Sequence, residues 1–301
     1  MINGIVNINK EIGFTSHDVV AKLRGITKQR KIGHTGTLDP DAVGVLPICF
    51  GKATKVCELL TNKDKVYVTT LLLGKVTDTQ DSSGKIIDEY DVSGLLENEV
   101  QKCIMSFVGE YMQIPPMYSA IKIKGKKLYE LARKGVEVER TPRKVVINYI
   151  NVLEIDLPRV KMEVSCSKGT YIRTLCHDIG RKLGCGGMME YLLRTKVGDF
   201  VLDRSITIDV FRDIFLDEKL DTVLLNVDSV FQGYPKKTIK RGEEQRAYNG
   251  NAVPLNIIVE KGSLNHGEKV RLYDFKGGFV GICKYADGKL NMEKMFYDKV
   301  I

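Results

Sequence analysis

The order of strand-like and helix-like segments limits the possible folds of this chain more than any other feature. Apolar residues alternate along 160–166, and a second strand pattern covers 145–155 just before it. A helical pattern follows over 171–183, where Gly184 would end the helix. Other parts of the chain show patterns of both kinds: strands over 4–9 and 66–73, and helices beginning after Thr15 or Ser16 and spanning 96–107. Because strands and helices do not alternate regularly, the pattern argues against a doubly wound parallel sheet and predicts a mixed α+β fold.

The length of 301 residues predicts about two domains. A boundary is expected near Gly233–Pro235, because short strand patterns separated by glycine-containing turns follow it. These strands are expected over 269–273, 279–285 and 290–295. We therefore predict a larger domain at 1–235 and a small β-barrel-like module at 236–301.

Cysteine usage and the N-terminal sequence predict a cytoplasmic protein. The seven cysteines are scattered and form no C-x-x-C pair, and the chain has only four histidines. This argues against a disulfide framework and against a metal site. The first residues show no secretory signal, and no apolar run approaches the length of a membrane span.

The distribution of charge is more informative than the net charge of +8. Residues 122–144 hold nine Lys and Arg against three Glu, a net of +6. Residues 236–301 hold thirteen basic and eight acidic residues, a net of +5, so the rest of the chain is slightly acidic. Two basic zones favour a nucleic-acid backbone as partner, although a solvated loop and an ordinary β module would have the same charge.

The segment 33–47 has the most unusual composition. It is rich in Gly, Thr, Asp and Pro, it lacks a hydrophobic period, and apolar segments flank it. With the two residues before it, this segment predicts a loop over 31–47 on a rigid scaffold, a common setting for a functional site. Asp39 precedes Pro40, so its backbone is biased toward an extended conformation that projects the carboxylate. From the local pattern alone, a turn-forming Asp-Pro pair is the alternative.

Ordered motifs resemble those of the TruB family of tRNA pseudouridine synthases. The first is the loop itself, GHTGTLDPDAVGVLPICFGKATK at 33–55. The others follow in the family's order: KVY at 65–67 with LG at 73–74, TDTQD at 77–81, QIPPMYSA at 113–120 with KKLY at 126–129, SKGTYIR at 167–173, and LLRTKVGDF at 192–200. The resemblance implies a mainly antiparallel sheet core of the pseudouridine synthase type, with a PUA-like RNA-binding domain at 236–301.

The resemblance also implies a reaction and a set of roles. Uridine becomes pseudouridine when the N1–C1′ bond breaks, the base turns, and C5 joins C1′, so no redox change, cofactor or metal is required. Asp39 matches the family's essential aspartate, which would attack C6 or C1′ or remove a sugar proton, and Arg173 would pair with it. Tyr67 would stack on the flipped base, with its hydroxyl a candidate acceptor of the C5 proton. The expected substrate-binding residues include Lys10 and His34, and His34 would insert into the T-loop stack. Tyr171 and Leu192 would line the base pocket, and Asp81 would orient Arg173. Without the resemblance, a surface charge at Arg173 and a core tyrosine at Tyr67 are the simpler interpretations.

The segment 115–144 resembles the family's thumb loop, which closes over RNA. Its cations suited to phosphates are Lys122, Lys124, Lys126, Lys127, Arg133 and Lys134. The expected partner is tRNA, bound through its T arm and acceptor stem, with no membrane, no protein partner and a monomeric chain.

One departure from the family pattern and three alternatives remain. Glu11 follows Lys10 where the family usually has proline, which is expected to loosen Lys10. A non-catalytic RNA-binding protein would share the basic zones without needing Asp39, Tyr67 and Arg173. A carboxylate-based hydrolase would need a second acid opposite Asp39. A relative that works in a guide-RNA complex would not need the long basic segment at 115–144.

Overall fold

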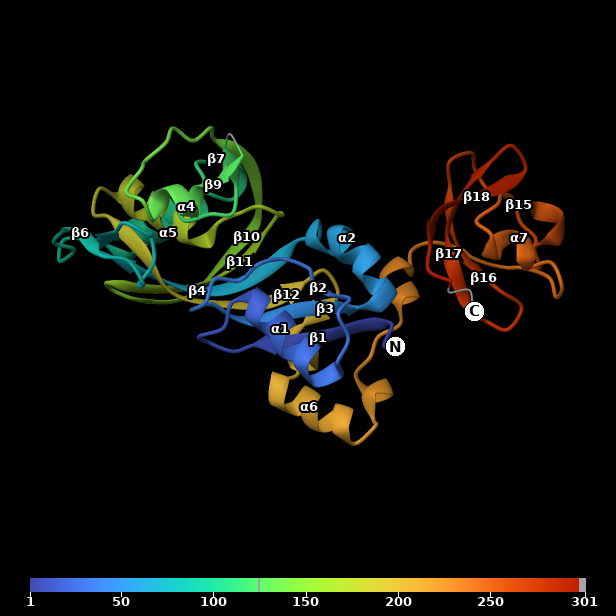
Figure 1. Cartoon of the computed structure of the whole chain (residues 1–301). Helices are drawn as coiled ribbons and strands as arrows, with labels where there is room; N and C mark the ends of the chain where they lie inside the picture. Colours follow the sequence, from blue (N-terminus) through green and yellow to red (C-terminus); the bar gives the residue numbers. More distant parts are fainter. Residues whose placement is uncertain (124, 298–301) are drawn as a thin grey trace. The chain divides into compact units, whose positions relative to one another are not determined.

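The computed structural model describes residues 1–123 and 125–297 (Figure 1). Contacts divide the chain into two compact units. The larger comprises Val6–Ile48 and Val56–Leu220, and the smaller comprises Met1–Ile5, Cys49–Lys55 and the chain from Asp221 on. The predicted boundary near residue 235 stays a prediction. Lys124, one of the cations expected to bind phosphate, lies outside the described residues.

A long mixed sheet forms the centre of the larger unit. Its strands are β1 (Gly4–Lys10), β2 (Ile32–His34), β3 (Val43–Phe50), β4 (Lys65–Leu73), β7 (Gly109–Gln113), β10 (Arg143–Asp156), β11 (Arg159–Cys166), β12 (Gly187–Val197) and β13 (Phe200–Val201). The order is β1-β3-β12-β4-β11-β10-β7, with β2 on β3 and β13 on β12. From β12 to β7 each neighbouring pair is antiparallel, whereas β3 and β12 are parallel. The predicted mainly antiparallel α+β fold is confirmed.

Helices cover one face of this sheet. Apolar residues of α3 (Glu97–Met105) and α5 (Ile172–Leu183) pack in one core cluster with inward residues of β4, β10 and β11. The predicted strands at 66–73, 145–155 and 160–166 and the predicted helices at 96–107 and 171–183 are confirmed within a few residues. Gly184 ends α5 in the left-handed conformation, with φ of 76°. Among the described residues, no helix is both long and apolar enough to span a bilayer.

Smaller elements surround the sheet. They are α1 (Ser16–Thr27), α2 (Cys57–Thr61), α4 (Leu128–Ala132), α6 (Ile208–Leu216), and the strand pairs β5 (Lys75–Thr77) with β6 (Ile86–Glu89) and β8 (Lys122–Ile123) with β9 (Lys126–Lys127). The structure selects Thr15 as the N-cap of α1, because its side chain accepts from the Asp18 N–H in a capping box. This leaves the Ser16 hydroxyl available for another contact.

The predicted loop at 31–47 is partly wrong. Its ends form β2 and β3, so that only residues 35–42, with Asp39 among them, are loop. Val43 and Gly44 pair with Leu193 and Arg194 of β12, residues that lie about 150 positions further along the chain. Pairing with a distant strand overrides local composition, which is why the sequence did not indicate β3, and β2 in turn pairs with β3.

The smaller unit contains a second sheet. Its strands are β14 (Lys236–Thr238), β15 (Val253–Pro254), β16 (Lys269–Tyr273), β17 (Phe279–Ala286) and β18 (Lys289–Met295), in the order β14-β16-β17-β18-β15. The three predicted strands are confirmed as β16, β17 and β18. The sheet curls into a half-barrel around a small apolar core, into which α7 (Gln245–Tyr248) contributes Ala247 (Figure 1). The comparison with a PUA domain stays a prediction.

Candidate active site

Asp39 and Arg173 lie in contact at the centre of the candidate site. Nη2 of Arg173 is 3.0 Å from Oδ2 of Asp39, and Nη1 is 3.2 Å from Oδ2 of Asp81. Nη2 also donates to the main-chain oxygen of Tyr118 at 2.9 Å. The Arg173 side chain is 8% exposed, whereas that of Asp39 is 41% exposed. The ion pair therefore leaves one side of the Asp39 carboxylate open while Arg173 stays inside the protein.

Asp81 holds Arg173 from the other side. Its Oδ1 accepts hydrogen bonds from the hydroxyls of Thr79 and Ser83, each at 2.6 Å, and from the Ser83 N–H at 3.1 Å. Since Oδ2 is engaged by Arg173, both carboxylate oxygens are occupied. This is the contact that the predicted role of Asp81 requires. The hydrolase alternative needs a second free acid beside Asp39, which Asp81 does not supply.

The residue that follows Asp39 is fixed by the N-terminal segment. The Pro40 carbonyl accepts from Lys10 Nζ and from the Gly13 N–H, both at 3.0 Å. Lys10 is fully buried and also donates to the Glu11 carbonyl at 3.0 Å. Burial lowers the pKa of Lys10 to about 8. Lys10 is thus held at two points although Glu11 replaces the usual proline, and its contact is with the loop backbone.

The residue that precedes Asp39 is fixed by Ser16. The Leu38 N–H donates to Ser16 Oγ at 2.9 Å, and Ser16 Oγ donates to the Leu38 carbonyl at 3.4 Å. Both residues are buried. The Asp39 backbone is therefore clamped on both sides by α1 and the turn before it, which holds the carboxylate in one place. Ser16 was not among the predicted site residues.

Partial burial raises the pKa of the Asp39 carboxyl, and the Arg173 charge acts in the opposite direction. An ion pair with a buried guanidinium favours the ionised form of the carboxyl and fixes its orientation. The site thus contains one accessible carboxylate whose direction is set by a buried cation.

Tyr67 and Leu192 line the apolar side of the site. Both are buried and belong to one cluster with Leu38, the neighbour of Asp39. Tyr67 on β4 lies directly across from Arg194 on β12. Burial raises the pKa of the Tyr67 phenol, and Arg194 opposes this shift. The burial of Tyr67 agrees with the simpler interpretation that it is a core residue. A core tyrosine does not need a charged neighbour, however, and Tyr67 has Arg194 opposite it.

Tyr171 sits at the start of α5, next to Arg173. Its N–H donates to Oε1 of Gln113 at 2.8 Å, and its carbonyl accepts from Nε2 of the same side chain at 3.0 Å. The Arg173 guanidinium carbon is 6.0 Å from the Tyr171 ring centroid. Gln113 was not predicted as a site residue, yet it fixes the turn that carries Tyr171.

His34 lies at the end of β2, where the Asp39 loop begins. Its ring meets the ring of His17 edge-on, with centroids 5.1 Å apart and planes at 76°. The Gly36 N–H donates to His34 Nδ1 at 3.3 Å, so the neutral imidazole makes this bond. Burial lowers the pKa of His34. The ring is therefore oriented from both α1 and the loop.

The two predicted lysines of the basic segment differ in their surroundings. Lys126 is exposed on β9. Lys127 is half-buried and donates to the Tyr129 hydroxyl at 3.1 Å, with its Nζ 5.3 Å from the Tyr129 ring centroid. Lys126 is thus the freer of the two to meet a phosphate.

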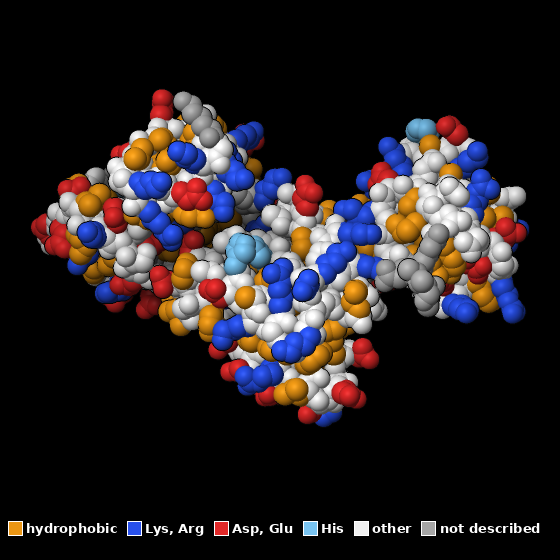
Figure 2. All heavy atoms as spheres, viewed as in Figure 1, with side chains coloured by type: hydrophobic (Ala, Val, Ile, Leu, Met, Phe, Trp, Pro, Cys, Tyr) orange, Lys and Arg blue, Asp and Glu red, His pale blue; other side chains and the backbone are white. Residues whose placement is uncertain are grey.

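A third basic segment, which was not predicted, lies at 22–31. Five cations and no acid lie in these ten residues, in the C-terminal part of α1 and just after it: Lys22, Arg24, Lys28, Arg30 and Lys31. All five are exposed. Figure 2 shows basic side chains over the region of α1 as well as over that of α4 and β9. A count of charge in short windows would have revealed this segment before the structure did.

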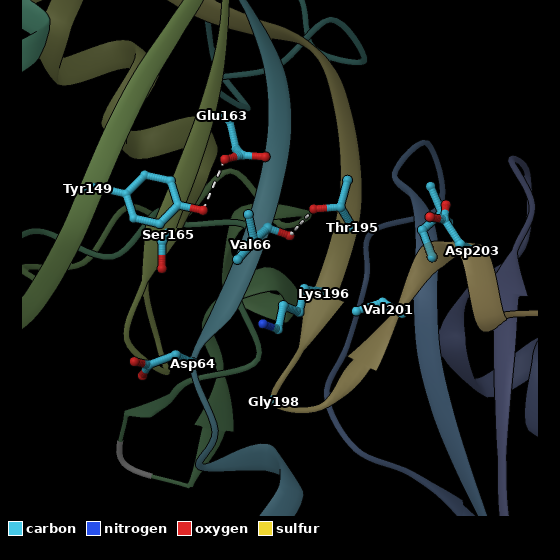
Figure 3. Close-up of a pocket in the computed structure, with 11 residues that line it drawn as sticks. Asp64, Val66, Tyr149, Glu163, Ser165, Thr195, Lys196, Gly198, Val201 and Asp203 are labelled. Atoms are coloured by element: carbon cyan, nitrogen blue, oxygen red, sulfur yellow. Dashed lines mark hydrogen bonds between the residues drawn. The ribbon is translucent and has the colours of Figure 1, made fainter.

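A cavity of about 550 Å³ lies on the opposite face of the sheet (Figure 3). Val66 and Thr195 belong to it and adjoin Tyr67 and Arg194, whose side chains point the other way. In it, the Tyr149 hydroxyl donates to Glu163 at 2.9 Å. The cavity contains none of the predicted site residues. Among the described residues, no group of three or more His, Cys, Asp or Glu side chains is placed to hold a metal ion.

Two family models match adjoining parts of the chain. The TruB family pseudouridylate synthase N-terminal domain matches residues 24–172, and the tRNA pseudouridylate synthase B C-terminal domain matches residues 173–232. Curated relatives named tRNA pseudouridine synthase B extend the similarity over nearly the whole chain. That of Alkaliphilus oremlandii is 48% identical over 93% of this chain and 92% of the relative, and that of Lachnoclostridium phytofermentans is 48% identical over 96% and 97%.

Solved structures resemble the chain over a similar extent. A Cbf5-Nop10-Gar1 complex contains a chain that matches with a TM-score of 0.72 and 29% identity, over 98% of this chain and 85% of that one. An H/ACA RNP bound to a substrate RNA containing 2′-deoxyuridine matches with a TM-score of 0.71 and 26% identity, again over 98% and 85%.

Proposed function

The chain belongs to the TruB family of pseudouridylate synthases, and we propose that it converts the uridine at position 55 of the tRNA T loop to pseudouridine with Asp39 as nucleophile. The relatives named tRNA pseudouridine synthase B support the coarser function, the isomerisation of uridine in tRNA. The observation that carries the assignment to Asp39 is its ion pair with buried Arg173, which leaves the carboxylate open on one side.

The reaction requires one carboxylate that is ionised and aimed. Arg173 stabilises the negative charge of Asp39, and Asp81 keeps the guanidinium in place. Lys10 and Ser16 fix the backbone on either side. Such preorganisation matters because a displacement of the reacting group by about 1 Å can cost roughly a hundredfold in rate.

Proton movements balance within the reaction. C5 loses a proton when it is joined to C1′, and N1 gains one when its bond to the sugar breaks, so no redox cofactor takes part. Tyr67 is the group we assign to the C5 proton, because its hydroxyl is buried beside the Asp39 loop and faces a cation. The same tyrosine ring would stack on the flipped base.

The uridine must leave the RNA stack before Asp39 can reach it. Extrusion costs a few kcal/mol, which enzymes offset by stacking on the base and by filling the gap. His34 is the group proposed to fill the gap, because its half-buried ring is held by His17 and Gly36. Leu192 and Tyr171 would line the base pocket, which agrees with the burial of Leu192 and the fixed backbone of Tyr171.

RNA contacts are proposed for three basic parts of the chain: the thumb-like segment 115–144, the segment 22–31, and the PUA-like module at 236–301. Lys126 is exposed on the first, and Arg30 and Lys31 are exposed on the second. Because these cations belong to the chain itself, a single copy of the protein would bind the T arm and acceptor stem without a guide RNA or a protein partner.

The test uses an unmodified tRNA transcript and maps pseudouridine along it after incubation with the protein. We expect a single modified site, at position 55, and no product when that uridine is replaced by cytidine. Pseudouridine at another position would contradict the choice of substrate. No pseudouridine with any tRNA, from protein shown to be folded, would contradict the proposed activity.

A further inference from the structure

Arg194 belongs to the motif at 192–200, which assigned it no role, and it forms no ion pair among the described residues. Its role rests on the proposed function of Tyr67. We propose that Arg194 is a positioning residue that joins the Asp39 loop to Tyr67 and supplies the counter-charge for the Tyr67 phenolate. Arg194 is 1% exposed, and by volume it has the largest fully buried side chain among the described residues.

The guanidinium is bonded to main-chain oxygens of the loop and of the strand that follows it. Nε donates to the Val45 carbonyl at 2.7 Å, and the two terminal nitrogens lie 3.4 Å from the carbonyls of Thr37 and Gly36. These contacts bracket the Asp39 loop at its two ends. Arg194 therefore fixes the loop from the β12 side, as Lys10 and Ser16 do from the N-terminal side.

The sheet places the same guanidinium against Tyr67. Arg194 is paired with Tyr67 on β4 and with Gly44 on β3. Side chains directly opposite in an antiparallel pair lie on one face of the sheet and within contact distance. The Arg194 guanidinium opposes the rise that burial causes in the pKa of the Tyr67 phenol. Gly44 has φ of 106°, and a Cβ there would lie 2.2 Å from the Arg194 carbonyl oxygen, so only glycine permits this close packing.

The charge of Arg194 is not neutralised by an acid. Arg173 contacts both nearby carboxylates, Asp39 and Asp81, whereas no ion pair with Arg194 occurs in the part of the chain that the structure describes. A guanidinium remains protonated even when buried, because its intrinsic pKa is so high. A permanent cation beside a buried phenol favours the phenolate, and it does so where no solvent screens it.

This charge fits the proton cycle of Tyr67. As the N1–C1′ bond breaks, the phenol gives its proton to N1, directly or through water, and becomes a phenolate. After C5 has bonded to C1′, the phenolate takes the C5 proton, and the electron pair of that C–H bond restores the C5=C6 double bond. One proton is given and one is taken, so Tyr67 returns to its starting state, and Arg194 balances the charge in between.

The test compares a neutral and a charged replacement. Arg194→Gln removes the charge and keeps a donor for the Val45 carbonyl, whereas Arg194→Lys keeps the charge with fewer donors. A 3-fluorotyrosine placed at position 67 in the full-length protein reports the phenol pKa by fluorine NMR, in the absence of RNA. Lys65→Met is the control, because Lys65 is also a buried cation on β4 but bonds to the carbonyls of Thr61 and Lys63.

We expect the Tyr67 pKa to rise by about one unit or more in Arg194→Gln, and by less than about half a unit in Arg194→Lys and in Lys65→Met. With tRNA, kcat should fall about a hundredfold in Arg194→Gln and recover about tenfold in Arg194→Lys, with KM nearly unchanged. A Gln variant whose Tyr67 pKa is unchanged would overturn the inference.

If only the Lys variant folds, a rise of a full unit in that variant would overturn the inference as well. Separately, Tyr67→Phe with wild-type turnover would overturn the acid–base role in the proposed function. Since the pKa measurement uses no substrate, the two failures are distinguishable.

Discussion

Replacing Ser16 by alanine tests whether the backbone clamp on Asp39 serves catalysis. The change removes the 2.9 Å bond from the buried Leu38 N–H and the longer bond to the Leu38 carbonyl. A buried N–H left without a partner costs about 1–3 kcal/mol, so the free energy of unfolding should fall by about that amount. The Leu38 backbone is then free to shift, which moves the Asp39 carboxylate relative to Arg173. A shift of about 1 Å predicts a loss of roughly 10–100-fold in kcat.

Thr15→Ala is the matched control. Thr15 caps the same helix, and its side chain accepts from the Asp18 N–H at 3.1 Å. Among the described residues, no hydrogen bond joins the Thr15 side chain to the Asp39 loop. Loss of an N-cap costs about 0.5–2 kcal/mol, close to the cost expected for Ser16. Urea unfolding gives the stability of both variants, and tritium released from C5-labelled uridine in a tRNA transcript gives turnover. Equal losses of kcat in Ser16→Ala and Thr15→Ala would refute the clamp, because stability alone would then explain the loss.

Three further predictions concern RNA binding and pH. Lys126→Glu should weaken tRNA binding and reduce the slope of log K against log salt by about 0.7 for the lost contact. Lys127→Glu should have a smaller effect on both, because Lys127 already donates to the Tyr129 hydroxyl. Binding titrations at several salt concentrations measure both variants. Arg30→Glu with Lys31→Glu should raise KM at low salt and leave kcat unchanged, as steady-state kinetics would reveal. Burial lowers the pKa of His34, so at mildly acidic pH the unfolded chain binds a proton that the folded chain does not. The free energy of unfolding of the wild type should therefore fall as pH drops below about 7, by at most about 1.4 kcal/mol per pH unit. His34→Phe should lack this contribution, as urea unfolding at pH 5–7 would measure.

Each of these has a result that would count against it. A salt slope unchanged by Lys126→Glu means that this lysine is solvated in the complex. A fall in kcat at constant KM for the paired Arg30 and Lys31 changes means that the segment affects the site itself. Parallel pH profiles of stability for the wild type and His34→Phe mean that the imidazole titrates alike in the folded and unfolded states.

Regular periodicity allowed much of the fold to be predicted. The alternation in β11 and the amphipathic pattern of α5 come from the side of each element that faces the core, and that pattern is present in the sequence itself. β3 was missed because its strand conformation depends on pairing with the distant β12, and β2 was missed because it in turn pairs with β3; local composition encodes neither pairing. The three strands predicted for the C-terminal module are confirmed, but their sheet curls into a half-barrel and not into the predicted β-barrel.

The part of the candidate site that consists of contacts between charged side chains could be predicted. The motifs pointed to Asp39, Arg173 and Asp81, and the structure brings these three together. Ser16 and Arg194 bond to main-chain oxygens and N–H groups, for which any loop sequence offers partners, so the sequence assigned neither of them a role in the site.

Outside residues 122–144 and 236–301 the net charge of the chain is slightly acidic, although residues 22–31, just before the Asp39 loop, hold five cations and no acid. Acidic residues elsewhere in the sequence balance these cations in the total. RNA affinity is therefore expected to depend on three basic segments and not on two.

The most direct test of the account compares Asp39→Asn with Asp41→Asn in the same tRNA assay. Both changes remove one negative charge from the same loop and keep the shape of the side chain, but Asp41 is exposed and has no ion pair among the described residues. We predict that Asp39→Asn lowers kcat by about 10⁴-fold or more and that Asp41→Asn stays within about threefold of the wild type. Pseudouridine formed by Asp39→Asn at a rate near that of the wild type would contradict the central claim that this carboxylate is the nucleophile.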